Sequence, residues 1–385
     1  MTKTWLLPEW VFDGETLLNN KALCVSDGKI SDVVDADQAP SGAVALAGIV
    51  APGFLDLQVN GGGGTLFNQT PTPEGVASIA QAHRAYGTVG ILPTVITDTP
   101  DVLAQAVEAA IAAKGTTGIL GVHIEGPHIS VPRRGTHSAH FVRAMDDDTI
   151  AHVARLRAAE IPVMITVAPE TTSCTQIAQL ADLGAIVSIG HSDASSEQTQ
   201  AAIEAGVTCA THLFNAMSPM LNRAPGVTGA VINSHVTAGI IADGIHVADD
   251  MIALAVRARP KADLMFIVSD AMPTVGGPDH FNLYGNDVYL KDGQLVNAEG
   301  SLAGAHLTQA QGVHHLVNAV GLSRQEALRM AVTIPASVIG RSDLAALKGR
   351  ALEDVIQLAN DMSFAGFLSE TLAQKSVKSA ESVES

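Results

Sequence analysis

Short runs of apolar, often β-branched residues recur along the chain, and each run ends in glycine, proline or a polar residue. Runs that are apolar almost throughout are typical of strands buried on both faces of a sheet. Eight such runs span residues 49–60, 87–97, 118–128, 162–170, 185–193, 208–217, 237–246 and 264–272. The pattern therefore predicts eight buried strands.

Alanine-rich stretches lie between most of these runs, and their apolar residues follow the helical period of 3.6. The clearest predicted helices span Pro73–Tyr86, Pro100–Lys114 and Ser195–Ala205. Buried parallel strands need crossover helices that cover the sheet, so strict alternation of the two indicates a closed parallel sheet. We therefore predict an α/β fold, a (β/α)8 TIM barrel, over residues 49–343.

The two ends of the chain show a different pattern of short, alternating strands. Asp27-Gly28 is a strong hairpin signal between two strand-like runs, and further short strands are predicted at 354–358 and 362–368. Neither end is long enough to form a core alone, so we expect one small β-sandwich domain built from both. The predicted domains are residues 1–48 plus 344–385 for the sandwich and 49–343 for the barrel. Residues 274–304 are expected to form an insertion that returns to the barrel mouth.

The net charge of the chain limits the kinds of partner that it is expected to bind. The chain has 22 Lys+Arg against 39 Asp+Glu, a formal net charge of -17. An acidic surface repels phosphate backbones and anionic lipids, so we expect neither a nucleic-acid partner nor a membrane partner. Pro8, Glu9 and Asp13 interrupt the N-terminal apolar residues, and no later run reaches the roughly 18 to 20 residues of a membrane span. A cytoplasmic location is therefore expected.

Polar side chains gather at the carboxyl ends of the predicted strands, which is where a barrel carries its chemistry. Glu125, His191 and His212 end the third, fifth and sixth strands, so each can point toward one spot. Two imidazoles and a carboxylate are typical of a catalytic zinc site, although iron, manganese or cobalt would fit the same donors. Asp270 ends the eighth strand and is the natural general base. A turn or capping role is the alternative for each residue taken singly.

Nine motifs occur in a fixed order: PGFLDLQVNG, HIEGPH, RRGTH, IGHSDA, THLFNAM, RAPGVTGA, ADGIHV, VSDAM and GSLAGAHLT. From about residue 49 to 340 this series resembles the N-acetylglucosamine-6-phosphate deacetylases of the amidohydrolase superfamily. The resemblance implies a metal-dependent enzyme of amino-sugar catabolism. The implied reaction converts N-acetyl-D-glucosamine 6-phosphate to D-glucosamine 6-phosphate and acetate.

The resemblance also implies roles for individual residues. Glu125, His191 and His212 match the metal ligands, Asp270 matches the catalytic acid/base, and His137 matches the histidine that polarises the acetamide carbonyl. Implied substrate contacts are Thr136, His137, Asn215, Ala216, Arg223, Asp243, Gly244, Ile245, His246, Leu302, Ala303 and Gly304. The arginine matching Arg223 reaches the sugar phosphate of the neighbouring subunit in relatives, which implies a homodimer.

One departure bears on the metal. Most amidohydrolases carry His-x-His at the end of the first strand, whereas this chain has Gln58 and Asn60. An amide is a poor metal ligand beside an imidazole, so a single divalent metal per subunit is predicted, with zinc as the default. Three alternatives stay open: deacetylation of the galactosamine epimer, hydrolysis of another amide such as a cyclic one, and a catalytically inactive binding protein.

Overall fold

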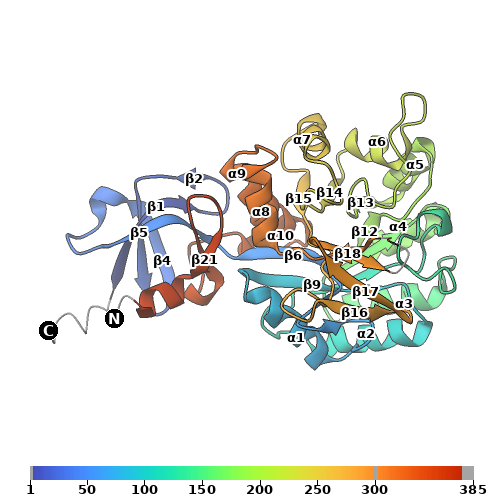
Figure 1. The fold of residues 1–385 in the computed structure, drawn as a ribbon, viewed down its shortest axis with the longest axis horizontal. Helices are drawn as coiled ribbons and strands as arrows, with labels where there is room; N and C mark the ends of the chain where they lie inside the picture. The colour runs from blue at the N-terminus through green and yellow to red at the C-terminus, as the bar shows by residue number, and fades with distance from the viewer. Residues whose placement is uncertain (1–2, 298–299, 301, 375–385) are drawn as a thin grey trace.

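Eight parallel strands form the barrel of the computed structural model, which describes residues 3–297, 300 and 302–374 (Figure 1). In chain order, which is also their order in the sheet, they are β6 (Phe54–Val59), β9 (Thr88–Ile96), β10 (Val122–Glu125), β11 (Val163–Val167), β12 (Ile186–Ile189), β13 (Val207–Ala210), β14 (Thr237–Ile240) and β15 (Met265–Ile267). The amide of Asp270 donates to the carbonyl of Gln58 (3.0 Å) and closes the ring between the last strand and the first. The predicted barrel is confirmed.

Helices follow most of the strands and surround the barrel in Figure 1. They are α1 (Pro73–Arg84), α2 (Pro100–Ala112), α3 (Asp147–Ala158), α4 (Cys174–Asp182), α5 (Ser196–Ala205), α6 (Gly226–Ile232), α7 (Asp249–Ala258), α8 (Gln309–Asn318), α9 (Arg324–Leu328) and α10 (Ile334–Val338). Thr72, Thr99 and Ser195 cap the N-termini of α1, α2 and α5, each accepting a backbone N–H in the first turn. These caps explain why the three predicted helices start within a residue of where the pattern places them.

Strands from both chain ends pair in a separate sheet, at the left of Figure 1. They are β1 (Thr4–Phe12), β2 (Leu17–Leu18), β3 (Lys21–Ser26), β4 (Lys29–Asp35), β5 (Val44–Pro52), β20 (Val355–Leu358) and β21 (Phe364–Phe367). Asp27 and Gly28, both with positive φ, form the tight turn between β3 and β4. The seven strands form one continuous sheet, whereas the predicted sandwich implies two. Residues 1–2 and 375–385 of the predicted terminal domain lie outside the described residues.

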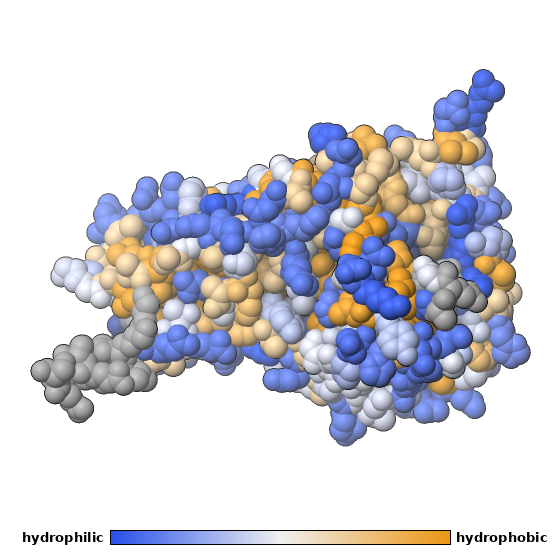
Figure 2. Space-filling model, in the orientation of Figure 1, coloured by the Kyte–Doolittle hydropathy of each residue, from blue (hydrophilic) through white to orange (hydrophobic). Residues whose placement is uncertain are grey.

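A four-stranded antiparallel sheet follows the last barrel strand. Its strands are β16 (His280–Leu283), β17 (Asn286–Lys291), β18 (Gln294–Asn297) and β19 (Leu302–Ala305). Ala305 pairs with Ala271, so this insertion returns to the barrel mouth as expected. Figure 2 shows apolar residues gathered beside β18, with polar side chains around them. A small hairpin of β7 (Gly61–Gly62) and β8 (Thr65–Leu66) lies after the first barrel strand.

Each part has a core of its own. One large cluster of buried side chains fills the barrel and the space between its strands and helices. A second cluster, which includes Leu6, Leu23, Ile30 and Val50, lies within the terminal sheet. No helix within the described ranges is both long enough and apolar enough to cross a membrane.

Candidate metal centre and active site

Glu125, His191 and His212 meet at the carboxyl end of the barrel. Glu125 is the last residue of β10, and the two histidines lie two residues beyond β12 and β13. Their Nε2 atoms lie 3.2 and 3.0 Å from Oε1 of Glu125, and 3.0 Å from each other. Ligands about 2.0–2.1 Å from a tetrahedral ion are about 3.3 Å apart, so the three atoms fit the coordination sphere of one metal.

Hydrogen bonds orient this ligand set. The carbonyl of Arg133, in the short helix η2 (Val131–Arg133), lies 2.9 Å from Nδ1 of His191. A carbonyl can only accept, so Nδ1 carries the proton and Nε2 keeps its lone pair for a metal. Nδ1 of His212 is buried without a hydrogen-bond partner. Burial raises the pKa of Glu125, but its hydrogen bonds to the two histidines outweigh burial and hold the pKa well below its usual value.

The backbone at this end of the barrel adopts an unfavourable conformation at three side chains that face the cavity. The φ angles of His191, His212 and Asp270 are +47°, +33° and +51°. Residues other than glycine rarely adopt this left-handed region, at a cost on the order of 1 kcal/mol or more, and they concentrate at functional sites. The sharp turn directly after each strand is therefore a further mark of the site.

Asp270 lies beside the ligand set without joining it. Its Oδ1 accepts hydrogen bonds from the side-chain amides of Gln58 (3.0 Å) and Asn60 (2.7 Å). The same Gln58 amide donates to Oε1 of Glu125 (3.0 Å), so Gln58 links the two carboxylates. Burial and the charge of Glu125 raise the pKa of Asp270 to about 6. A carboxyl group with such a pKa can both accept and donate a proton near neutral pH.

His137 faces the same cavity from the loop after β10. Its Nδ1 lies 2.7 Å from Oγ1 of Thr97, just after β9, and its ring centroid lies 4.4 Å from that of His191. Burial, and then the neighbouring His191, lower the pKa of His137 to about 3, so the ring is neutral. When Thr97 donates to Nδ1, Nε2 carries the single ring proton and can donate it to a ligand in the cavity.

These residues line a cavity of about 160 Å³ at the barrel mouth. The predicted site residues in its wall are Glu125, Thr136, His137, His191, His212, Asn215, Ala216, His246, Asp270, Leu302 and Gly304. Asn60, Ile96, Gly135, Ile241 and Met272 complete it. The described part of the chain contributes no lysine or arginine to this wall, so any anionic group bound here must find a cation elsewhere.

Four other predicted contacts lie next to the cavity wall. Asp243 and Ile245 line a neighbouring cavity of about 570 Å³, Gly244 lies against His315, and Ala303 is buried in the four-stranded sheet. Asp243 is hydrogen-bonded to His246, since its Oδ2 lies 2.6 Å from Nδ1 of that histidine. The carboxylate therefore holds the ring that lines the cavity.

Arg223 lies away from the cavity of its own chain. It is exposed in the loop between β13 and α6, where Met220 and Leu221 are also exposed, by 42% and 57%. This loop projects at the upper right of Figures 1 and 2, with a hydrophilic tip above apolar residues. The structure thus does not bring Arg223 together with the other predicted substrate contacts.

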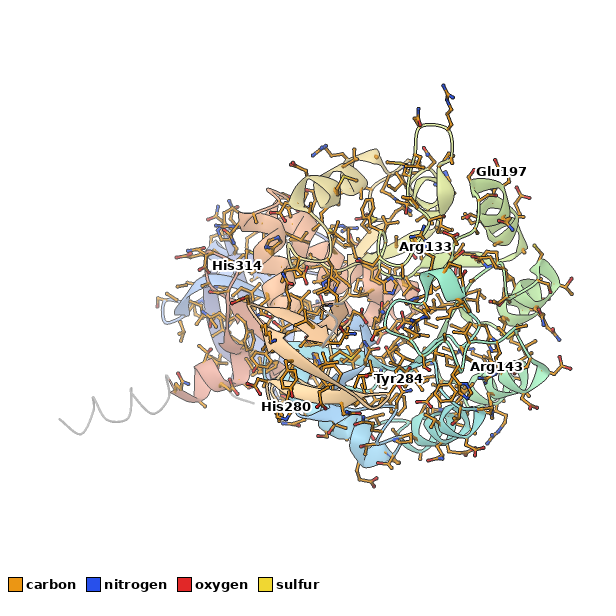
Figure 3. The ribbon with its side chains drawn as sticks, turned by 45° about the vertical axis from the view of Figure 1, so that its right-hand side comes forward. Arg133, Arg143, Glu197, His280, Tyr284 and His314 are labelled. Atoms are coloured by element: carbon orange, nitrogen blue, oxygen red, sulfur yellow. The ribbon has the colours of Figure 1, made fainter. Side chains whose placement is uncertain are left out.

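Three functional contacts were missed by sequence reasoning. The first joins Thr97 to His137, and the second joins Arg133 to His191. In the third, the hydroxyl of Tyr284 donates to the backbone carbonyl of Thr97. Figure 3 shows Tyr284 at the tip of the β16–β17 hairpin, on the side of the molecule that also carries Arg133. Thr97 is a polar strand end like the predicted residues, so that signal could have found it. The other two contacts join distant segments and leave no local pattern.

A parallel eight-stranded barrel with a buried Glu-His-His group that could hold a metal ion, and a further buried carboxylate beside it, is typical of the class of metal-dependent TIM-barrel hydrolases. The model of the amidohydrolase family matches residues 49–348. The chain belongs to this family.

Relatives with named activities cover most of the chain. An N-acetylgalactosamine-6-phosphate deacetylase from Shewanella sp. (strain ANA-3) is 39% identical over 82% of this chain and 80% of its own length. An N-acetylglucosamine-6-phosphate deacetylase from Haemophilus influenzae is 33% identical over 76% and 77%.

Solved structures agree over almost the whole chain. The N-acetylglucosamine-6-phosphate deacetylase of Pasteurella multocida superposes with a TM-score of 0.88 at 32% identity, covering 95% of this chain and 98% of that one. A mutant of the Mycobacterium smegmatis enzyme, in complex with N-acetyl-D-glucosamine-6-phosphate, gives 0.86 at 29% identity, covering 96% and 100%.

Proposed function

We propose that this protein hydrolyses the acetamide of N-acetyl-D-glucosamine 6-phosphate, releasing acetate and D-glucosamine 6-phosphate. The observation that carries the proposal is the convergence of Glu125, His191 and His212 on one point, with Asp270 beside them. The resemblance and the named relatives supply the substrate. Zinc is the default metal for this donor set, with one ion per subunit.

The side chains divide the reaction between them. Glu125, His191 and His212 would hold a divalent metal, which would supply a Lewis acid for the acetamide carbonyl and make a bound water more acidic. Asp270 takes a proton from the attacking water and delivers it to the departing nitrogen. His137, neutral and tied to Thr97, donates from Nε2 to the oxygen on which negative charge develops. One proton of the attacking water thus passes through Asp270 to the amine, and the other is released to the amine or the solvent. The reaction needs no further cofactor.

Phosphate recognition requires a second chain in this proposal. A sugar phosphate needs cationic partners, and Arg223 is exposed on a projecting loop away from its own cavity. We propose that the protein is a homodimer in which Arg223 reaches the phosphate bound in the neighbouring barrel, while His246 orients the sugar. Arginine suits this task because its planar fork matches phosphate oxygens. The cytoplasmic location stays a prediction.

Deacetylation of the galactosamine epimer is the second candidate. It is favoured by the 39% identity to a relative named for that substrate, against 33% for the Haemophilus influenzae enzyme. The two sugars differ at one hydroxyl, so the same groups would act on both acetamides.

Acetate release tests the proposal. Metal-loaded protein is assayed with N-acetylglucosamine 6-phosphate, its galactosamine epimer and unphosphorylated N-acetylglucosamine, with the Asp270→Asn variant as the blank. We expect rapid release from one of the two phosphorylated sugars and poor turnover of the unphosphorylated one. Absence of acetate from all three sugars, with metal shown to be bound, would refute the assignment. Preference for the galactosamine epimer would establish the second candidate in its place.

A further inference from the structure

Four buried polar side chains lie inside the barrel directly below the metal ligands, and none of them lines the cavity. They are His123 on β10, Thr166 on β11, Ser188 on β12 and Thr211 just after β13. All four are 0–3% exposed. Alternate residues of a strand share a face, so His123 and Glu125 point to the same side of β10. We call these four side chains the hydroxyl chain.

Hydrogen bonds connect the hydroxyl chain from end to end. Nδ1 of His123 lies 3.1 Å from the carbonyl of Leu57, and its Nε2 lies 2.7 Å from Oγ1 of Thr166. Oγ1 of Thr211 lies 2.6 Å from that of Thr166 and 2.7 Å from Oγ of Ser188. The series therefore links β6, β10, β11, β12 and β13, which include every strand that carries a metal ligand.

The donor and the acceptor in each hydrogen bond of the series follow from the bond between His123 and Leu57. The carbonyl of Leu57 can only accept, so Nδ1 of His123 donates to it. The ring is fully buried and has no hydrogen bond to a carboxylate, which favours the neutral imidazole, so Nε2 accepts the proton of Thr166. Each hydroxyl has one proton to give, so Thr166 accepts from Thr211, and Thr211 accepts from Ser188. All four members are thereby satisfied; the carbonyl of Leu57 ends the series at His123, and Ser188 at the other end contacts the thiol of Cys209.

None of the four side chains lines the cavity, which favours a role in positioning over one in proton transfer. Thr166 and Thr211 also pack on either side of Gly190, the residue before His191. A Cβ at Gly190 would lie 2.8 Å from a methyl carbon of Thr166 and 2.8 Å from Cβ of Thr211. Thr211 itself directly precedes His212. The hydroxyl chain therefore contacts the backbone that carries both histidine ligands.

We propose that the hydroxyl chain is a positioning device for the metal centre. It fixes the spacing of the strands that hold Glu125, His191 and His212, so that their ligand atoms stay about 3 Å apart. The inference rests on the proposed metal centre. Groups behind a metal site commonly change metal affinity by about 10- to 100-fold when removed.

Thr166→Val tests the inference because valine keeps the shape and removes the hydroxyl in the middle of the series. Affinity is measured by competition with a chelator, and ligand geometry by the visible absorption of the Co²⁺-loaded protein. We expect at least about a 10-fold loss of affinity and a changed Co²⁺ spectrum. Thr166→Ser keeps the hydroxyl, so its metal affinity and its Co²⁺ spectrum should match those of the parent. The matched control is Thr88→Val, since Thr88 is equally buried on β9 and its hydroxyl has no partner.

The outcomes separate this inference from the proposed function. If Thr166→Val binds metal with the parent's affinity and spectrum, the inference is wrong, even if the variant melts at a lower temperature. If the parent itself binds no metal, the proposed metal centre fails as well. Should Thr166→Val not fold, Ser188→Ala removes the last donor of the series and is measured instead. Ser188→Ala should lower the metal affinity and change the Co²⁺ spectrum, each by less than expected for Thr166→Val. An unchanged affinity and spectrum would overturn the inference.

Discussion

Two layers of polar side chains lie one above the other in the barrel, and they differ in how far their hydrogen bonds are satisfied. In the cavity wall, Oδ1 of Asn60 and Nδ2 of Asn215 have no partner. In the hydroxyl chain below, every side-chain donor is used. Buried polar atoms are rarely left unpaired, so the upper layer is arranged for a ligand and the lower layer for the protein itself.

The two layers also differ in charge. The upper layer combines the carboxylates of Glu125 and Asp270 with histidines, whereas the lower layer consists of hydroxyls and one buried imidazole. A buried carboxylate is costly unless cations or donors surround it, so the upper layer is stable only with its full set of partners. The comparison therefore predicts that changes in the upper layer alter chemistry and that changes below it alter geometry or stability.

The largest expected effect is loss of the metal from the upper layer. His212→Ala removes one of the three proposed ligands, so metal affinity and acetate release should each fall by more than about 100-fold, the upper end of the effect typical of groups behind a metal site. Elemental analysis and the acetate assay measure the two losses. His152→Ala, on the partly exposed helix α3, is the control and should retain both. Two tightly bound metal ions per chain in the parent would contradict the single-metal prediction.

A smaller effect is expected when the metal stays and the proton carrier is removed. Asp270→Asn keeps the shape of the side chain but cannot move a proton, so kcat should fall by about 100-fold or more with metal still bound. Asp270 must be ionised to accept a proton, so kcat/KM of the parent should rise with pH through about 6. The variant should lose that rise. A turnover within a few-fold of the parent would show that another group is the base.

Much of this arrangement could be predicted from the sequence because its signals are local. Eight apolar runs and their polar ends are visible in the chain, and they place Glu125, His191, His212 and Asp270 at one edge of the barrel. The roles of His137 and of the substrate contacts follow from the family resemblance, although Asn215, Asp243 and His246 are also polar residues at strand ends. Barrel closure, which brings Asp270 to Gln58, agrees with the prediction.

The lower layer could not be predicted in the same manner. His123 and Ser188 stand within apolar runs, where a single polar residue does not disturb the strand pattern. The hydrogen bonds of the hydroxyl chain join residues that are 23 to 45 positions apart, so only the register of the folded sheet brings them together. The hydrogen bond of Tyr284 to Thr97 spans 187 residues and has the same origin.

An intermediate effect is expected for Arg223, which tests whether one chain alone supplies all the groups that bind the substrate. Arg223→Ala should raise KM for the phosphorylated sugar by about 10-fold or more, the scale of one hydrogen bond to a charged group. Turnover of the unphosphorylated sugar should hardly change, because the acetamide chemistry is untouched. Arg257→Ala is the control, since Arg257 is exposed on α7. Equal loss with both sugars would mean that Arg223 serves folding or the metal centre.

Mixed dimers show whose cavity Arg223 serves. Subunits carrying Arg223→Ala are exchanged with subunits carrying Asp270→Asn. If Arg223 acts in the neighbouring barrel, a heterodimer has one site with both defects and one with neither, so activity should partly return. No recovery despite demonstrated exchange would place Arg223 in its own barrel.

The smallest effect concerns Asp56, an ionisable group below the cavity that should affect stability rather than rate. Asp56 is fully buried on β6, and its Oδ1 accepts the backbone N–H groups of Gln58 and Ser269 at 3.2 Å each. Its Oδ2 has no partner. Burial raises the pKa of Asp56 from 3.8 to about 6, despite the hydrogen bonds that lower it. The folded protein thus binds this proton more tightly than the unfolded chain does.

A raised carboxyl pKa stabilises the fold only while the group is protonated. That contribution is complete below about pH 4 and is lost as pH rises to about 6, so the stabilisation that Asp56 gives to the parent should fall by on the order of 2 kcal/mol over this range. Asp56→Asn keeps the Oδ1 acceptor and cannot ionise, so relative to the parent it should gain that amount between pH 4 and pH 8 in denaturant unfolding. Asp292→Asn, at an exposed turn, is the control and should show no such gain. If the difference between Asp56→Asn and the parent were the same at both pH values, Asp56 would ionise as readily as in the unfolded chain, and its burial below the cavity would not raise its pKa.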